Sequence, residues 1–167
     1  MIVDLPFAGK IKITKLYGTP PPVGMTYSAG KHAGIDLVGM DNKLVYPIVS
    51  GVVYKTGYDT DGWGNYVVVK QNDGYFAIYA HLDKITAAKN EEVILGRFLG
   101  IMGATGNVTG AHLHLEIRRN YSNKYSTIDP AEYLGIKNKL GVIEMAEDKN
   151  KPSSWAQDAW DWAEAIG

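Results

Sequence analysis

The most informative absence in this sequence is cysteine, of which the 167 residues contain none. The chain therefore has no disulfide bond and no thiolate that could hold a metal ion. Any metal site must use histidine and carboxylate side chains. Only four histidines are present, which limits the candidates to His32, His81, His112 and His114.

Charge of one sign and long apolar runs are also missing. The net charge is −1, and no basic run suggests a surface for nucleic acid or for a membrane. No apolar stretch approaches the roughly 20 residues of a membrane-spanning helix. The N-terminus, Met1-Ile2-Val3-Asp4-Leu5-Pro6, shows no charged segment followed by a long apolar one, so we expect no signal peptide.

The residues that are present favour an all-β globular fold. Hydrophobic residues make up 46% of the chain, enough to bury a core, and its 19 glycines separate short runs rich in Val, Ile and Tyr. An Asp-Gly step in 71–74 predicts a hairpin, and Asp129-Pro130 predicts the start of a short helix. The strands expected from these patterns are Lys10–Leu16, Leu44–Tyr54, Tyr66–Lys70, Tyr75–Ala80 and Phe98–Met102.

The segment His112–Ile117 reads H-L-H-L-E-I, and this strict alternation predicts a half-buried strand. Residues two apart on a strand share a face, so His112 and His114 point the same way with Cα atoms about 6.6 Å apart. Leu113, Leu115 and Ile117 then face the core. A metal ion would explain the paired imidazoles, although an exposed polar face would produce the same pattern.

Two further segments carry chemistry. In His32-Ala33-Gly34-Ile35-Asp36, a straight strand would separate the histidine from the aspartate by about 13 Å, too far for one ion. Both can bind one metal only if the backbone bends near Gly34; otherwise His32 is a loop histidine and Asp36 a strand-edge carboxylate. His81 follows the strand Tyr75–Ala80, where it is expected either at the rim of a site or as a surface histidine.

The composition changes near the C-terminus, which suggests three parts. Residues 1–140 are expected to form the main domain and 141–152 a linker, which includes the charged stretch 147–151. Residues 153–167 are expected to form an amphipathic helix, because Trp155, Ala159 and Trp162 recur at helical spacing.

Together these motifs resemble the lysostaphin-type zinc endopeptidases of bacterial cell walls. The resemblance covers roughly residues 11–134 and is carried by His32-x3-Asp36, Tyr79-Ala80-His81-Leu82 and His112-x-His114. It implies an all-β fold with an antiparallel sheet and an open substrate groove. The C-terminal stretch resembles the start of helical repeats in some Gram-positive phage lysins, which suggests part of a wall-targeting module.

The resemblance also implies a role for each matching residue. His32, Asp36 and His114 are expected to bind one Zn²⁺, with a fourth position left for water. His81 and His112 are expected to be catalytic histidines that do not bind the metal, and Tyr27 is the nearest candidate for an assisting tyrosine. No His-Glu-x-x-His motif is present, so a glutamate base of that kind is not available.

Three functions remain open at this point. The first is zinc-dependent hydrolysis of a peptidoglycan peptide by a monomeric enzyme that acts at the cell wall. Without a signal peptide, such an enzyme would be released from the host cytoplasm or carried on a phage tail. The second is a non-catalytic peptidoglycan-binding or regulatory module, and the third is a zinc peptidase that acts on proteins.

Overall fold

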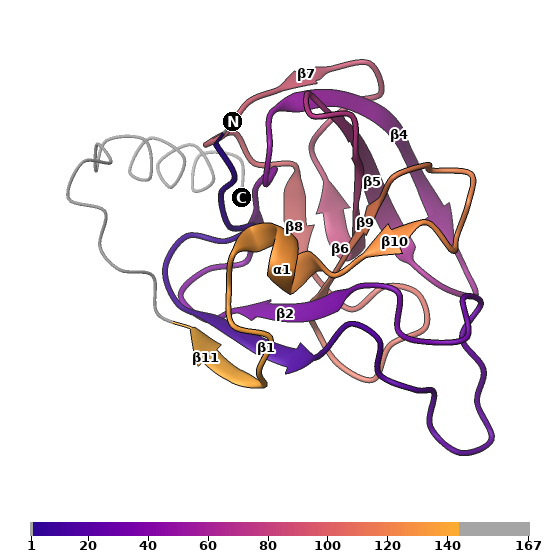
Figure 1. Cartoon of the computed structure of the whole chain (residues 1–167). Helices are drawn as coiled ribbons and strands as arrows, with labels where there is room; N and C mark the ends of the chain where they lie inside the picture. The colour runs from indigo at the N-terminus through magenta and orange to yellow at the C-terminus, as the bar shows by residue number, and fades with distance from the viewer. Residues whose placement is uncertain (1, 144–167) are drawn as a thin grey trace.

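Antiparallel strands make up nearly all of the regular structure in the computed structural model, which describes residues 2–143 (Figure 1). This confirms the expected all-β class. The elements in chain order are β1 (Ile11–Lys15), β2 (Ile35–Gly39), β3 (Leu44–Val45), β4 (Gly51–Asp59), β5 (Gly64–Gln71), β6 (Phe76–Ile85), β7 (Glu92–Val93), β8 (Gly100–Met102), β9 (Leu113–Arg118), β10 (Thr127–Ile128), α1 (Pro130–Leu134) and β11 (Gly141–Ile143).

The strands pair into one sheet in the order β11-β1-β2-β9-β6-β5-β4-β7. Three short strands lie off this path or bridge it: β10 pairs with β9, and β8 pairs with both β3 and β6. In Figure 1, β1, β2 and β11 run across the direction of β4, β5, β6 and β9. Strand β9 joins the two groups, because β2 pairs with it on one side and β6 on the other.

The alternation in β9 separates the core from the opposite face of the sheet, as the sequence predicts. The strand is not half-buried as expected, however, because all six of its residues are buried. Leu113, Leu115 and Ile117 are fully buried in the main core, which also includes residues of β1, β2, β5 and β6. His114 lies on the other face, directly opposite Asp36 of β2 and Ala80 of β6. A second, smaller apolar cluster covers this face of β5 and β6.

Two expectations about strand boundaries are wrong. The expected strand Leu44–Tyr54 is interrupted, because β3 ends at Val45 and β4 begins only at Gly51. The sequence also suggests that the strand Tyr75–Ala80 ends at His81, but β6 continues to Ile85 and pairs with β8. His81 has a positive φ of 65°, and the pairing with β5 shifts register between Asn65 and Val67. This bulge changes the direction of the His81 side chain. It does not end the strand, because a bulge disrupts the pairing only locally.

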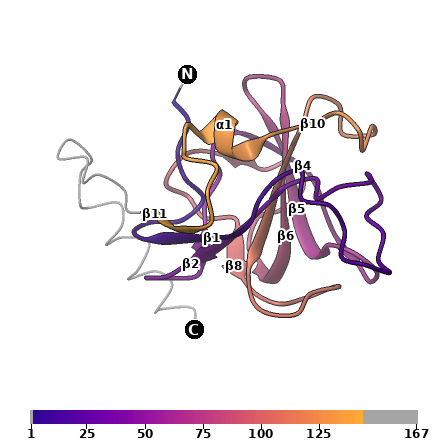
Figure 2. The same ribbon diagram turned by 60° about the horizontal axis from the view of Figure 1, so that its bottom comes forward.

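The C-terminal part of the described chain closes the sheet. Asp129 caps α1 by accepting a hydrogen bond from the Ala131 backbone N–H, and Pro130 occupies the first turn, as predicted. The first residues of the expected linker form β11, which pairs with β1 (Figure 2). The rest of that linker and the expected helix at 153–167 lie outside the described residues, within which no helix is long and apolar enough to cross a membrane.

Candidate metal centre

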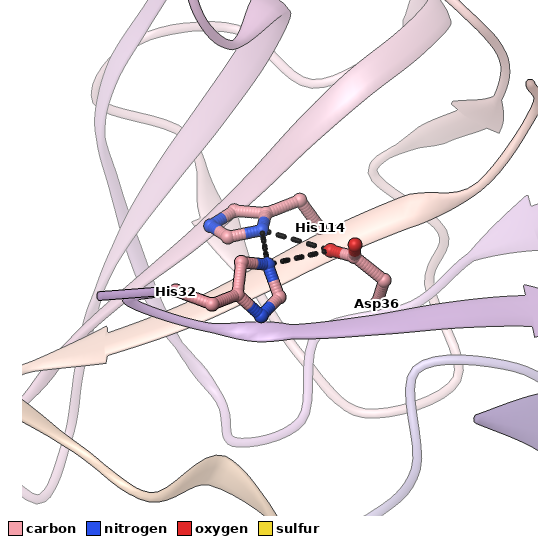
Figure 3. A group of neighbouring side chains, drawn as sticks. All are labelled: His32, Asp36 and His114. Carbon is pink, nitrogen blue, oxygen red and sulfur yellow. Dashed lines mark hydrogen bonds and ion pairs between the residues drawn. The ribbon is translucent and has the colours of Figure 1, made fainter. Parts of the chain in front are cut away.

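Three side chains converge on a single point beside β9 (Figure 3). Oδ1 of Asp36 lies 3.0 Å from Nε2 of His32 and 3.0 Å from Nδ1 of His114, and the two nitrogens are 3.1 Å apart. Ligand atoms held at 2.0–2.1 Å around a tetrahedral Zn²⁺ are separated by about 3.3 Å. The donor set and its spacing therefore fit a zinc ion with a fourth position left open.

The pairing of β2 with β9 produces this arrangement. Asp36 and His114 are cross-strand partners, so their side chains leave the same face of the sheet side by side. His32 lies before the start of β2, where the chain is not yet extended in the ladder. The bend that the sequence requires between His32 and Asp36 is therefore present.

Gly34 matters because it has no side chain, and not because its backbone angles are unusual. Its φ is not positive, so other residues could adopt this conformation. A Cβ atom there would overlap the Leu115 carbonyl and lie 2.8 Å from the imidazole of His114. Glycine is needed because the chain passes directly against β9.

Hydrogen bonds on the far side of each ring orient the two histidines. Nδ1 of His32 donates to the Leu16 carbonyl at 2.9 Å, which leaves the lone pair of Nε2 for the centre. Nε2 of His114 faces Oε2 of Glu116 at 3.4 Å, which leaves Nδ1 for the centre. Partners of this kind fix the tautomer of a metal-binding imidazole and raise its basicity.

In the metal-free protein, burial and mutual contacts shift the pKa values of Asp36 and His114. Burial opposes the charge on Asp36, but hydrogen bonds from His114 and His32 outweigh it and hold the carboxyl pKa well below its usual range. Burial likewise opposes the charge on His114, but Asp36 and Glu116 raise its pKa to about 9. A metal ion must displace that proton at neutral pH.

Sequence reasoning missed Glu116 and Arg118. Glu116 is only 1% exposed, and its Oε1 accepts a hydrogen bond from Nε of Arg118 at 2.5 Å. Arg118 in turn donates to the Tyr121 carbonyl at 2.8 Å. The alternation that places His112 and His114 on one face also places Glu116 and Arg118 there, so the signal was present in the same strand.

His81 and His112 lie beside the three candidate ligands without joining them. Their ring centroids are 4.8 Å apart, and Nε2 of His112 lies 3.6 Å from Oδ1 of Asp36. Nδ1 of His81 donates to the Thr105 carbonyl and Nδ1 of His112 donates to the Gly110 carbonyl, both at 2.9 Å. Each neutral ring therefore keeps an unprotonated Nε2.

Tyr27 lies next to His32, with ring centroids 5.9 Å apart. Its hydroxyl accepts a hydrogen bond from Nζ of Lys15 at 2.8 Å. The structure thus brings Tyr27 close to the candidate metal site. Its assisting role remains a prediction, as do the roles of the other five residues.

Comparison with known proteins identifies the family. The model of Peptidase family M23 matches residues 30–130, more than half of the chain. The chain belongs to peptidase family M23. This match includes every expected site residue except Tyr27, which lies just before it.

Relatives within the M23 family have different named activities. Murein hydrolase activator NlpD of Escherichia coli is 35% identical over 107 residues, which are 64% of this chain and 27% of NlpD. Peptidoglycan DD-endopeptidase ShyA of Vibrio cholerae is 38% identical over 93 residues, which are 56% of this chain and 21% of ShyA. The chain therefore spans about a quarter of the length of these relatives.

A solved structure supports the fold of this M23 domain. The catalytic domain of the antimicrobial peptidase lysostaphin from Staphylococcus simulans superimposes with a TM-score of 0.66 at 31% identity. The match covers 74% of this chain and 92% of that domain. The expected lysostaphin-type fold is thus confirmed, whereas a phage origin stays a prediction.

Proposed function

We propose that this chain is a zinc-dependent endopeptidase that hydrolyses peptide bonds in the stems or cross-links of bacterial peptidoglycan. The observation that carries the proposal is the complete set of donor atoms from His32, Asp36 and His114, with His81 and His112 beside it. An M23 domain with both parts of this site has what hydrolysis requires. The relative ShyA, named a peptidoglycan DD-endopeptidase, supports the choice of substrate.

A zinc ion held by the three side chains would supply a Lewis acid that acidifies a bound water and polarises the scissile carbonyl. The carboxylate of Asp36 offsets part of the ion's charge, while Leu16 and Glu116 hold the two imidazoles in place. The chain itself must then accept a proton and steady the developing oxyanion.

His81 and His112 are our candidates for that work. Burial, together with the neighbouring His114 and His112, lowers the pKa of His81 to about 4, so its ring is neutral at pH 7. Nδ1 of each ring donates to a backbone carbonyl, which leaves Nε2 of a neutral ring free to accept a proton, and repulsion between the rings disfavours two protons at once. We expect one ring to accept the proton that the attacking water loses. The same ring, once protonated, can donate to the oxyanion and pass that proton to the leaving amine, while the other ring stays neutral.

A second function is supported by the similarity to NlpD, which is named a murein hydrolase activator. On this alternative, the domain binds peptidoglycan or a partner hydrolase and cuts nothing. The two functions differ in whether new amino termini appear when the purified protein meets the wall.

The deciding experiment is mass analysis of fragments from purified cell walls of several cross-link types, with and without a chelator. The endopeptidase should release fragments only without the chelator, and the new amino terminus should identify the bond. Replacing His114 by Ala should abolish both zinc content and fragment release. Replacing His81 by Ala should leave zinc content intact and slow release by about 10²-fold or more.

Glu92→Gln, on the exposed face of β7, is the matched control and should cut like the wild type. Fragment release that persists in the His114→Ala variant would contradict the proposal. Zinc-loaded protein that binds walls and releases nothing would favour the non-catalytic function.

The division into domains remains a proposal as well. We propose that residues 1–140 hold the enzyme, and that 153–167 belong to a wall-targeting segment joined through 141–152. Comparing wall binding by the full chain and by a chain shortened after Ile143 would test this, since only the full chain should bind strongly.

A further inference from the structure

We propose that Lys55, Tyr66 and Tyr121 form a binding site for a carboxylate group of the peptide substrate, on the same face of the sheet as His114. The three residues come from β4, from β5 and from the loop after β9. The choice of a peptidoglycan peptide as the ligand rests on the proposed function. Its geometry is independent of the metal centre.

The three side chains meet in space. Nζ of Lys55 lies 5.7 Å from the ring centroid of Tyr66 and 5.9 Å from that of Tyr121. A hydrogen bond to the Tyr66 hydroxyl, with support from Tyr121, raises the pKa of Lys55. Lys55 is therefore an ammonium at neutral pH, and its Nζ lies close to both tyrosine rings.

Gly57 shapes this cluster. It pairs with Tyr66 across β4 and β5, and a Cβ atom at Gly57 would lie 2.9 Å from the tyrosine hydroxyl. The missing side chain leaves room for the Tyr66 ring to cross β4 and bring its hydroxyl towards Lys55. Tyr66 itself is only 6% exposed, so its position is set by packing.

Lys55 gives the cluster a positive charge that forms no ion pair with an acidic group of the described residues. Among the ion pairs found within residues 2–143, none involves Lys55. Arg118, the other cation near Tyr121, is already paired with the buried Glu116. Tyr66 and Tyr121 are also placed to hydrogen-bond with each other, so the ammonium of Lys55 and one of the two hydroxyl hydrogens remain to donate to one anion.

The register of the sheet places the cluster on the site face. Glu116 pairs with Ile78, Ile78 with Val68, and Val68 with Lys55. Lys55 therefore stands in the same row as Glu116, two residues from His114. Strand β4 is three strands from β9, a distance of about 14 Å. An extended peptide spans that distance with about four residues.

Contacts of aromatic residues link the Lys55 cluster to His81. Trp63 contacts Tyr66 with ring centroids 5.2 Å apart, and its carbonyl accepts a hydrogen bond from the backbone N–H of His81 at 2.7 Å. Tyr121 contacts Tyr54 at 5.3 Å. Both ring pairs meet edge to face, at 61° and 65°, and they give a short peptide apolar contacts between His81 and Lys55.

A carboxylate is the occupant that this chemistry favours. Peptidoglycan stems carry free carboxyl groups a few residues apart, and an anion gains a charge-assisted hydrogen bond that a neutral amide lacks. The site would therefore select stems whose carboxyl groups are free over stems in which they are amidated.

The test measures binding, which does not depend on cleavage. A soluble stem peptide with free carboxyl groups, and the same peptide fully amidated, are titrated into the ¹⁵N-labelled full chain in the presence of a chelator. We expect the wild type to bind the free form more tightly by about fivefold, the factor of a partly exposed ion pair. Lys55→Gln should remove this preference, and Tyr66→Phe should reduce it.

Lys139→Gln changes the charge equally next to β11, at the opposite end of the sheet order from β4, and should keep the preference. Equal binding of the two peptides by the wild type, or a preference that survives in Lys55→Gln, would overturn the carboxylate site. Failure of the proposed function would instead appear as a wild type that shows the preference but never releases wall fragments.

Discussion

Glu116 lies behind a candidate metal ligand without itself reaching the metal position. It is buried, it accepts from Arg118, and it faces the ring nitrogen of His114 that points away from the centre. A carboxylate in that position makes the opposite nitrogen a stronger metal ligand.

Glu116→Gln should therefore weaken zinc binding by about 10–100-fold while keeping the side-chain volume. Competition with a chromogenic chelator measures the affinity, and circular dichroism shows whether the variant is folded. Glu92→Gln, exposed on β7, is the control and should bind zinc like the wild type. Unchanged affinity in the folded Glu116→Gln variant would show that Glu116 only fills space.

His114 makes zinc binding depend on pH. Its pKa in the metal-free protein is raised to about 9, above the ordinary value of 6.5, so the ring carries a proton at pH 7 that the metal must displace. The affinity for zinc should rise about tenfold per pH unit through this group and level off near pH 9.

Calorimetry in buffers of different ionisation enthalpy checks this, because it counts the protons released. About one proton per ion is expected from His114 at pH 7. An affinity that stops rising near pH 6.5 would contradict the raised pKa.

At the scale of elements, the contact between the start of β2 and β9 decides the site. Gly34 lies against the Leu115 carbonyl and the His114 ring, with no room for a side chain. Any atom added there must push the two strands apart or turn the histidine.

Gly34→Ala should lower the free energy of unfolding by about 1–3 kcal/mol, as overpacking does, and weaken zinc binding. Urea unfolding of the metal-free protein measures the first effect. Gly110→Ala is the control for stability, because nothing lies within 4 Å of the added atom. If both variants unfold alike, the close approach at Gly34 costs little.

The whole molecule should gain stability from the metal. The three candidate ligands come from two strands and the segment before β2, so one ion would join parts of the chain that are far apart in sequence. A ligand that binds only the folded state adds about 2.7 kcal/mol at a free concentration of 100 times its Kd.

Zinc at that level should raise the Tm by about 5–10 °C relative to protein in chelator. Differential scanning calorimetry measures the shift, and the His114→Ala variant should show almost none. A wild type with the same Tm in zinc and in chelator would argue against a metal site at these residues. The same samples, examined by ultracentrifugation, would test the expectation of a monomer.

Local chemistry by itself determined several features of this protein. The alternation in His112–Ile117 predicted which side of β9 enters the core, because the period of a strand is set by backbone geometry alone. Asp129 and Pro130 predicted the start of α1 for the same kind of local reason. The absence of cysteine confined any metal site to histidine and carboxylate.

Only the tertiary structure decided which segments meet. Asp36 and His114 are 78 residues apart, and the pairing and register of β2 with β9 depend on how the whole core is buried. The continuation of β6 past His81 depends in the same way on its pairing with β8, which no local sequence pattern predicts. The space at Gly34 and the convergence on Lys55 also arise from neighbouring strands, so no periodicity in the sequence could predict them.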